Sequence, residues 1–168
     1  MVKINRKKIS LVVFLMVIGI LSLTACGDKE ESEGKYTSKE IYDKVSASIT
    51  DMPEMTVVDN TTDEGKDSFT YVTDLEQDKI KDFVFAYSKD GKADEVVVIQ
   101  LKNSEDLKKV QADLEERLET RRNTFSIYDA EEGSKFQGAT VVKNGNYLML
   151  IIGNQAQNGK YAFNDMFK

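Results

Sequence analysis

Histidine and tryptophan are absent from this chain of 168 residues, which contains one cysteine and one proline. Without histidine the chain lacks the commonest metal ligand and general base, so histidine-dependent catalytic triads are excluded. A single cysteine forms neither an internal disulfide nor a thiolate zinc site. We therefore expect a protein that is not an enzyme and that holds no metal or organic cofactor.

The charge balance excludes a further class of partner. The formal net charge is −6, but the first 25 residues carry four of the 23 basic residues and none of the 29 acidic ones, so the remainder carries −10. An anionic domain is repelled by nucleic acid and by anionic lipid headgroups. We expect no nucleic-acid partner.

The N-terminus has the pattern of an export signal. Residues 1–8 (MVKINRKK) are basic, and the segment from Ile9 to Leu23 is apolar and free of charge. A basic start followed by an apolar core of this length is typical of a secretory signal peptide. The folded part is then expected outside the cytoplasm, attached to the cell membrane.

The residues after the apolar core resemble the bacterial lipobox. Leu23, Thr24, Ala25 and Cys26, followed by Gly27, give a large aliphatic residue, two small residues and a cysteine. The resemblance implies that the Cys26 thiol receives a diacylglycerol and that Leu23, Thr24 and Ala25 are recognised by the lipoprotein signal peptidase. Cys26 is then consumed by the lipid and is not a catalytic thiol.

The predicted organisation has three parts. Residues 1–25 are the lipoprotein signal peptide, residues 26–35 are the lipidated cysteine with a flexible tether, and residues 36–168 are a single extracytoplasmic domain. An alternative is an uncleaved transmembrane anchor over residues 9–27, which would span only about 29 Å as a helix. A second alternative is an incidental cysteine near an ordinary cleavage site.

Hydrophobic periodicity in residues 36–168 predicts an α+β fold. Thr37 and Glu40 match a capping box at the start of a helix over about residues 38–50. Leucines and a valine at spacings of three and four predict a long helix over about 104–123, and the aromatic-rich C-terminal segment 160–168 is expected to be a short helix.

Two hairpins are predicted, over about residues 82–101 and 139–152. Alternating aromatics, an Asp90-Gly91 turn and a valine-rich run indicate the first, and Asn144-Gly145 indicates the second. The apolar run from Tyr147 to Ile152 indicates a strand buried on both faces. We expect a small antiparallel sheet with the helices packed on one face.

Residues 51–81 carry the weakest pattern. Met55–Val58 and Phe69–Val72 are predicted to be short extended pieces on either side of a polar loop, residues 59–68, and a short helix is predicted over residues 75–81. A calcium loop beginning at Asn60 is not supported. It would require an acidic ligand at its twelfth position, where Tyr71 stands.

Several short motifs together resemble an uncharacterised lipoprotein family of Gram-positive bacteria, domain-of-unknown-function family 4358. They are the segment Tyr36–Tyr42 after the lipobox, Met52–Met55, Asn103–Asp106, Leu114–Leu118 and Asn144–Tyr147. The resemblance implies a small extracytoplasmic α+β lipoprotein. It implies no catalytic or binding residue, since the family has no assigned activity.

Few other residues suggest chemistry. The densest basic patch contains Arg117, Arg121 and Arg122, for which an ion pair between Asp113 and Arg117 on the helix surface is the plain account and a docking site for an acidic partner or ligand is the alternative. The acidic pairs Glu115-Glu116 and Glu131-Glu132 are expected on solvated faces. Four aromatic residues are expected in the core rather than on a carbohydrate-stacking surface: Phe83, Phe85, Tyr87 and Tyr147.

The expected function is a membrane-tethered, non-catalytic binding module of the cell envelope. Its partners are the membrane, through lipid on Cys26, and an unknown envelope protein or small ligand. The alternative is a small-ligand-binding accessory lipoprotein of a transporter, and an envelope hydrolase is the least favoured. An apolar pocket of several hundred Å³ with converging polar groups would favour ligand binding.

Overall fold

A computed structural model describes residues 34–168, which form a five-stranded antiparallel sheet in the order β1-β2-β3-β5-β4. Both predicted hairpins are confirmed, as β2 with β3 and β4 with β5, and β1 adds an edge strand. The predicted lipidation site Cys26 and its neighbours Leu23, Thr24 and Ala25 lie outside the described residues. The strands are β1 (Met55–Asp59), β2 (Ile80–Ser88), β3 (Glu95–Leu101), β4 (Thr140–Asn144) and β5 (Tyr147–Ile152).

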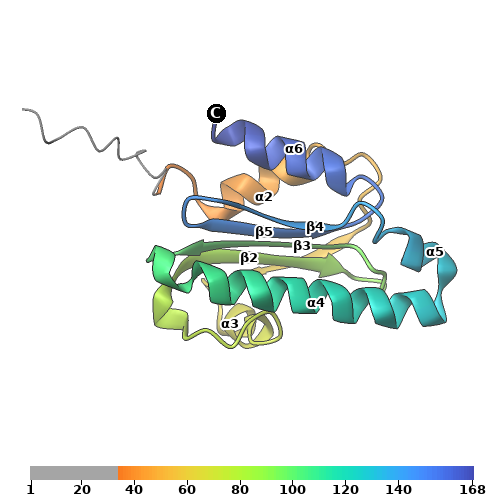
Figure 1. The fold of residues 1–168 in the computed structure, drawn as a ribbon, viewed down its shortest axis with the longest axis horizontal. Helices are drawn as coiled ribbons and strands as arrows, with labels where there is room; N and C mark the ends of the chain where they lie inside the picture. Colours follow the sequence, from red (N-terminus) through yellow and green to blue (C-terminus); the bar gives the residue numbers. More distant parts are fainter. Residues whose placement is uncertain (1–33) are drawn as a thin grey trace, which may run out of the picture. The chain divides into compact units, whose positions relative to one another are not determined.

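Helices cover both faces of the sheet, as Figure 1 shows. On one face lie α2 (Ser38–Ser46) and α6 (Ala156–Met166), and on the other lie α3 (Asp63–Phe69) and α4 (Leu107–Tyr128). The α+β class is confirmed, but the prediction of helices on one face only is wrong. Strands β3 and β5 are buried at every position, and side chains that alternate between two buried faces require cover on both.

The first helix begins as predicted. The Thr37 hydroxyl accepts from the Glu40 N–H and the Glu40 carboxylate accepts from the Thr37 N–H, which completes the capping box. The helix ends at Ser46 rather than near residue 50, since the hydroxyls of Ser46 and Ser48 donate to carbonyls of the preceding turn and compete with the helical pattern.

The segment between residues 51 and 81 was only partly predicted. Strand β1 lies where an extended piece was expected, but the polar loop contains α3, and Phe69 ends that helix instead of beginning a strand. The expected helix over residues 75–81 is reduced to a single 3-10 turn, Gln77–Lys79. A Cβ on Gly65 would lie 1.8 Å from the Asp59 carbonyl oxygen, so this glycine allows α3 to contact β1.

The later helices are longer than predicted. Helix α4 begins three residues later than expected, after a 3-10 turn, and extends to Tyr128. A short helix, α5 (Ala130–Ser134), follows it, capped by the Asp129 carboxylate. Helix α6 also begins before the predicted 160–168 segment. No helix within residues 34–168 has both the length and the apolar character needed to cross a bilayer.

Hydrogen bonds attach the first residues of the described chain to β2 and β5. The Tyr147 hydroxyl donates to the Tyr36 carbonyl at 2.7 Å and accepts from the Tyr36 N–H at 3.2 Å and from the Gln100 amide at 3.0 Å. The Ser38 hydroxyl donates to Asp82 Oδ1 at 2.5 Å. These bonds hold the first residues of the domain at the end of the sheet where β2 and β5 begin.

Candidate ligand-binding cleft

A cleft of about 410 Å³ opens on the α3/α4 face, between the second half of α4 and the end of the β2–β3 hairpin. Its volume falls in the range typical of small-molecule sites. Tyr71, on the turn after α3, borders it and is 77% exposed. Its other large side chains are Phe85 and Tyr87 from β2, Lys92 from the hairpin turn, Glu95 from β3, and Arg117, Arg121 and Phe125 from α4.

Two arginines meet one buried carboxylate in the cleft. Glu95 is 0% exposed, and Arg117 binds it in a two-pronged contact, Nε to Oε1 at 2.6 Å and Nη2 to Oε2 at 2.8 Å. Arg121 Nε lies 3.1 Å from Glu95 Oε2, an ion pair without the alignment of a hydrogen bond. A carboxylate removed from water needs such partners to remain ionised.

The spacing of α4 produces this arrangement. Val110, Leu114 and Leu118 are buried against the sheet. The positions four residues apart that continue toward the hairpin are Arg117, Arg121 and Phe125, so they lie on one side of the helix. Glu95 is the first residue of β3 and pairs with Tyr87 of β2. The next residue, Val96, packs on the α2/α6 face, so the alternation of side chains along the strand places Glu95 on the face that α4 covers. Long arginine side chains bridge the gap between helix and strand end.

The aromatic side chains stack against these charges. The guanidinium carbon of Arg117 lies 5.1 Å from the centre of the Phe85 ring, and that of Arg121 lies 5.2 Å from the Phe125 ring. Both distances are in the range of cation–π attraction. Burial lowers the pKa of Arg121, and the neighbouring Arg117 adds to the effect, while Glu95 and Asp94 oppose it.

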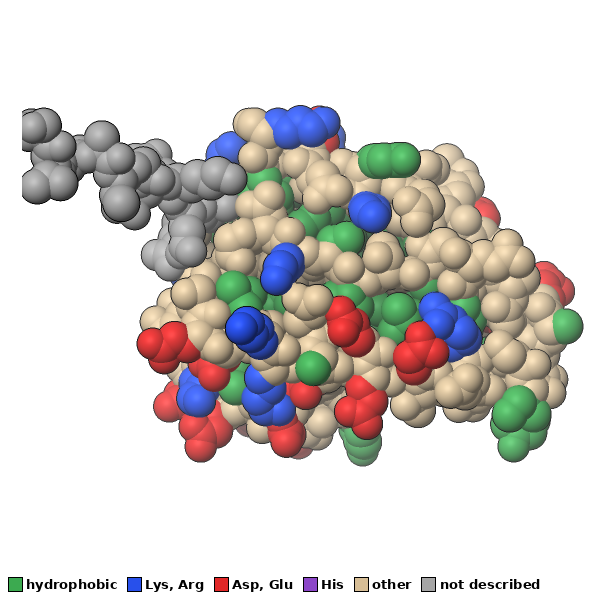
Figure 2. Space-filling view, viewed as in Figure 1, with side chains coloured by type: hydrophobic (Ala, Val, Ile, Leu, Met, Phe, Trp, Pro, Cys, Tyr) green, Lys and Arg blue, Asp and Glu red, His purple; other side chains and the backbone are tan. Residues whose placement is uncertain are grey.

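A second hollow of about 340 Å³ adjoins the cleft on the other side of Tyr71 and shares Arg117 and Arg121 with it. Its additional charged side chains are acidic: Asp74, Asp113 and Glu116. Figure 2 shows acidic and basic side chains interspersed over the lower half of the molecule, where α3 and α4 lie. Arg117 and Arg121 thus border both spaces, whereas these three acidic side chains border the second hollow alone.

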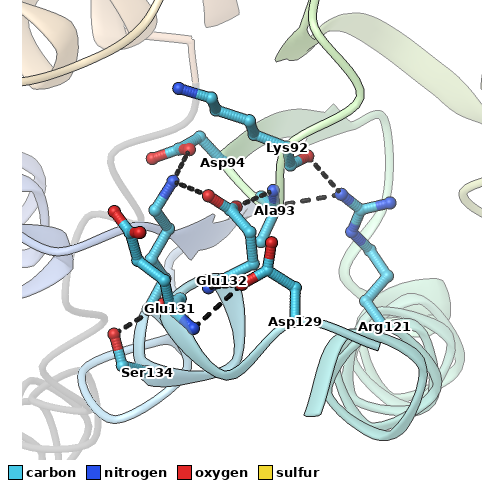
Figure 3. A network of polar contacts seen from close by, with 9 residues as sticks. Lys92, Ala93, Asp94, Arg121, Asp129, Glu131, Glu132 and Ser134 are labelled. Atoms are coloured by element: carbon cyan, nitrogen blue, oxygen red, sulfur yellow. Dashed lines mark hydrogen bonds and ion pairs between the residues drawn. The ribbon is translucent and has the colours of Figure 1, made fainter. Parts of the chain in front are cut away.

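A buried clasp holds the loop between β2 and β3, which forms one wall of the cleft (Figure 3). Lys135 Nζ lies 2.7 Å from Asp94 Oδ2 and 2.8 Å from Glu132 Oε1, and Glu132 Oε2 accepts from the Ala93 N–H at 2.6 Å. Arg121 Nη2 also donates to the Ala93 carbonyl, at 3.2 Å. Burial opposes the charge on Lys135, but its two carboxylate partners outweigh burial and raise its pKa.

The predicted basic patch is divided by the structure. Arg117 and Arg121 lie in the cleft, whereas Arg122 pairs with Glu119 on the helix surface. The expected ion pair between Asp113 and Arg117 is not made: Asp113 pairs with Lys109, and Arg117 with Glu95. The reason is that the buried Glu95 on a neighbouring strand needs the guanidinium as its counter-charge, whereas the half-buried Asp113 already has Lys109 and the Thr73 hydroxyl as partners.

Two other expectations need correction. Glu115, Glu116 and Glu131 are exposed as expected, but Glu132 is buried in the clasp. Of the aromatic residues, Phe83 and Tyr147 are core residues, while Phe85 and Tyr87 also line the cleft. Glu95 was not identified from the sequence, although a glutamate at the start of the apolar run EVVVIQL was a visible signal.

Comparison with known proteins identifies a family. The model described as "Domain of unknown function (DUF4358)" matches residues 54–153, a segment that includes β1 to β5, α4 and the whole cleft. No curated protein and no solved structure matches the chain. Within residues 34–168 no group of three or more acidic, cysteine or histidine side chains is placed to hold a metal ion.

Proposed function

The chain belongs to the DUF4358 family, and we propose that this member is a lipid-anchored extracytoplasmic domain that binds a small ligand in the cleft between α4 and the β2–β3 hairpin. The observation that carries the proposal is the convergence of Arg117, Arg121 and Glu95 among aromatic side chains in a hollow of about 410 Å³. Concave sites with apolar walls and a few convergent polar groups are the usual form of small-molecule sites. The role is binding, with no chemical step.

The anchor is supported by the sequence before the domain. The basic start, the apolar segment and Leu23-Thr24-Ala25-Cys26 favour export, cleavage and diacylglycerol transfer to Cys26. Two acyl chains give a stable attachment, because each buried methylene contributes about 0.8 kcal/mol and one chain alone is marginal. The domain would then lie on the outer side of the cytoplasmic membrane.

The first described residues of the domain and the cleft lie far apart. The chain enters the domain beside Asp82 and Tyr147, on the α2/α6 face. The cleft lies on the opposite face, beside Tyr87, five residues further along β2. At about 3.4 Å per residue this is about 17 Å along the strand. The cleft and the first described residues of the domain therefore lie on opposite faces of the sheet and toward opposite ends of β2.

A protein partner is the second candidate. Ile127 and Tyr128, at the end of α4 beyond the cleft, are both largely exposed, and Tyr128 is 83% exposed. Large apolar side chains in such positions are common in protein interfaces. A transporter or another envelope protein that receives the ligand would be a suitable partner for this surface.

The anchor is tested by metabolic labelling with a fatty-acid analogue. We expect label on the wild-type chain and none on Cys26→Ala, which should also lose its membrane attachment. Continued labelling of the variant would show that the lipid is elsewhere, and continued membrane attachment without label would favour the uncleaved transmembrane anchor.

The cleft is tested with indole probes on the full chain in detergent. Because the protein has no tryptophan, the fluorescence of bound indole is not hidden by the protein. We expect indole-3-acetate or indole-3-acetamide to bind the wild type. Tyr71→Ala should weaken binding at least fivefold, and the matched control Tyr128→Ala should leave it unchanged, since both tyrosines are exposed but only Tyr71 lines the cleft. Equal effects of the two substitutions would contradict the proposed site.

A further inference from the structure

We propose that the ligand of the cleft is a small organic anion: its carboxylate or phosphate group pairs with Arg121, beside Arg117, and its apolar part lies among the aromatic side chains. This inference rests on the proposed function, since it names the ligand class of the same cleft.

The first step is the charge of the cleft. Among its described side chains, the guanidinium groups of Arg117 and Arg121 face one carboxylate, that of Glu95. Lys92 also borders the cleft, but its side chain points away from Arg121 (Figure 3) and adds no charge beside the two guanidinium groups. One positive charge is left in excess, in a partly buried place where electrostatic interactions are stronger than in water.

The second step is the supply of hydrogen-bond donors. A guanidinium group carries five N–H donors in a planar fork that matches a carboxylate or phosphate. Arg117 binds Glu95 through Nε and Nη2 and donates a hydrogen bond from Nη1 to the Tyr71 carbonyl. Arg121 makes its contacts with Glu95 and the hairpin carbonyls through Nε and Nη2, which leaves Nη1 for a ligand.

The third step is the state of Arg121. Its pKa is lowered because it is buried and lies beside Arg117, and Glu95 and Asp94 do not fully compensate. A charged group in this situation gains more from an additional anion than a solvated one does. The cleft therefore holds a guanidinium that a bound oxyanion would stabilise.

The fourth step separates this cleft from the hollow beside it. In the second hollow the further charged groups are Asp74, Asp113 and Glu116, and even with Lys109 paired to the first two they leave a net negative charge that disfavours an anion. The aromatic rings of Phe85, Tyr87 and Phe125 lie on the hairpin side only. The anionic group and the apolar part of the ligand are thus both directed to the same side of Tyr71.

The test compares matched probes that differ in charge alone. Indole-3-acetate and indole-3-acetamide have nearly the same shape, and we expect the acid to bind the full chain at least tenfold more tightly at low salt. The preference should shrink as sodium chloride is raised, because salt screens the ionic contact. Phenyl phosphate against phenylacetate, measured by calorimetry, then compares the two anionic head groups on the same ring, and the anion that binds more tightly identifies the preferred head group.

The variants assign the effect to the arginine. Arg121→Gln should reduce the acid-to-amide ratio to near one while the amide still binds, and the matched control Arg122→Gln should keep the ratio, since Arg122 pairs outside the cleft. If Arg121→Gln fails to fold, as circular dichroism would show, Arg121→Lys takes its place and should lower the ratio by removing the fork. Equal binding of the acid and the amide would overturn the proposal of an anionic ligand but not that of a binding cleft. Binding of neither probe would overturn both proposals. A ratio unchanged by either Arg121 variant would overturn the role of Arg121.

Discussion

The α2/α6 face of the sheet is apolar except at the end where β2 and β5 begin, where Ser38, Asp82, Gln100 and Tyr147 form hydrogen bonds, whereas on the α3/α4 face Arg117 and Arg121 of α4 meet a buried carboxylate at the start of β3. On the first face, α6 lies so close that a Cβ on Gly159 would be 2.3 Å from Ile151 Cδ1. On the second, α4 stands off from the strand end, and Arg117, Arg121 and Glu95 occupy the space. Close packing thus joins α6 to the sheet on the first face, whereas on the second the charged side chains border the cleft.

This difference bears on how each face contributes to stability. Apolar burial is worth about 25 cal/mol for each Å² removed from water, and it requires no particular partner. A buried ion cluster contributes little net stability, but its members depend on one another, so the loss of one is costly. We expect the charged end of the α3/α4 face to be sensitive to single changes of charge and tolerant of a coordinated change.

The largest expected effect is that of Glu95→Ala. The substitution leaves two guanidinium groups together without their carboxylate, and we expect it to lower the free energy of unfolding by about 3–5 kcal/mol. Replacement of the whole cluster (Glu95→Leu with Arg117→Met and Arg121→Met) should restore most of this loss while removing the preference for an anionic probe. Urea denaturation measures the stability of both variants, and the indole probes measure the preference for an anion. A loss below about 1 kcal/mol in Glu95→Ala would show that the cluster is not coupled.

The next effect is that of Lys135→Met, which leaves Asp94 and Glu132 buried without their cation, and we expect a loss of about 3 kcal/mol. The pKa of Lys135 is raised, so its stabilisation is complete below the ordinary lysine pKa of about 10.4 and is lost as pH rises through the folded-state pKa. Urea denaturation between pH 8 and pH 11 should therefore show the difference between wild type and variant shrinking at the alkaline end. A constant difference across that range would contradict the assignment to charge.

Tyr147→Phe tests the α2/α6 face and should have a smaller effect. The hydroxyl joins the Tyr36 backbone to Gln100, and its loss leaves buried polar groups without a partner, at a cost of about 1–3 kcal/mol. Hydrogen exchange should rise at the amide of Tyr36 and remain unchanged at Ala93, which belongs to the clasp on the other face. Equal changes at both amides would mean that the two faces do not respond separately.

The smallest effect is that of Thr37→Ala, which removes the N-cap hydroxyl of α2. We expect a loss of about 1 kcal/mol, the usual cost of such a cap. Thermal unfolding measures it, with Thr124→Ala as the control, since that hydroxyl donates to the Thr120 carbonyl within an exposed turn of α4. If the control costs as much, the cap has no special role.

The parts of the fold predicted from sequence are those with a local cause. Asp90-Gly91 and Asn144-Gly145 each specify a tight turn between two strands, and Thr37 with Glu40 specifies a helix start. The prediction for residues 59–69 was wrong because the structure of this segment depends on a contact with another element. Their helix, α3, has no apolar stripe of its own, and it exists because Gly65 allows it to lie against β1.

The sequence indicated only some residues of the candidate site. The three arginines were noticed as a patch, but the choice between a surface ion pair and a binding site depended on a carboxylate 22 positions away, Glu95. Glu131 and Glu132 show the same limit: they are adjacent and chemically identical, yet one is exposed and the other is bonded to Lys135 and the Ala93 N–H.

The sequence by itself determined the α+β class, the two hairpins, the long helix and the family, because turn chemistry, capping and periodicity act over a few residues. The tertiary structure alone decided that helices cover both faces, which carboxylates are buried and where the cleft lies. Those outcomes depend on partners brought together from distant parts of the chain. A charged side chain becomes buried only where another element supplies its counter-charge.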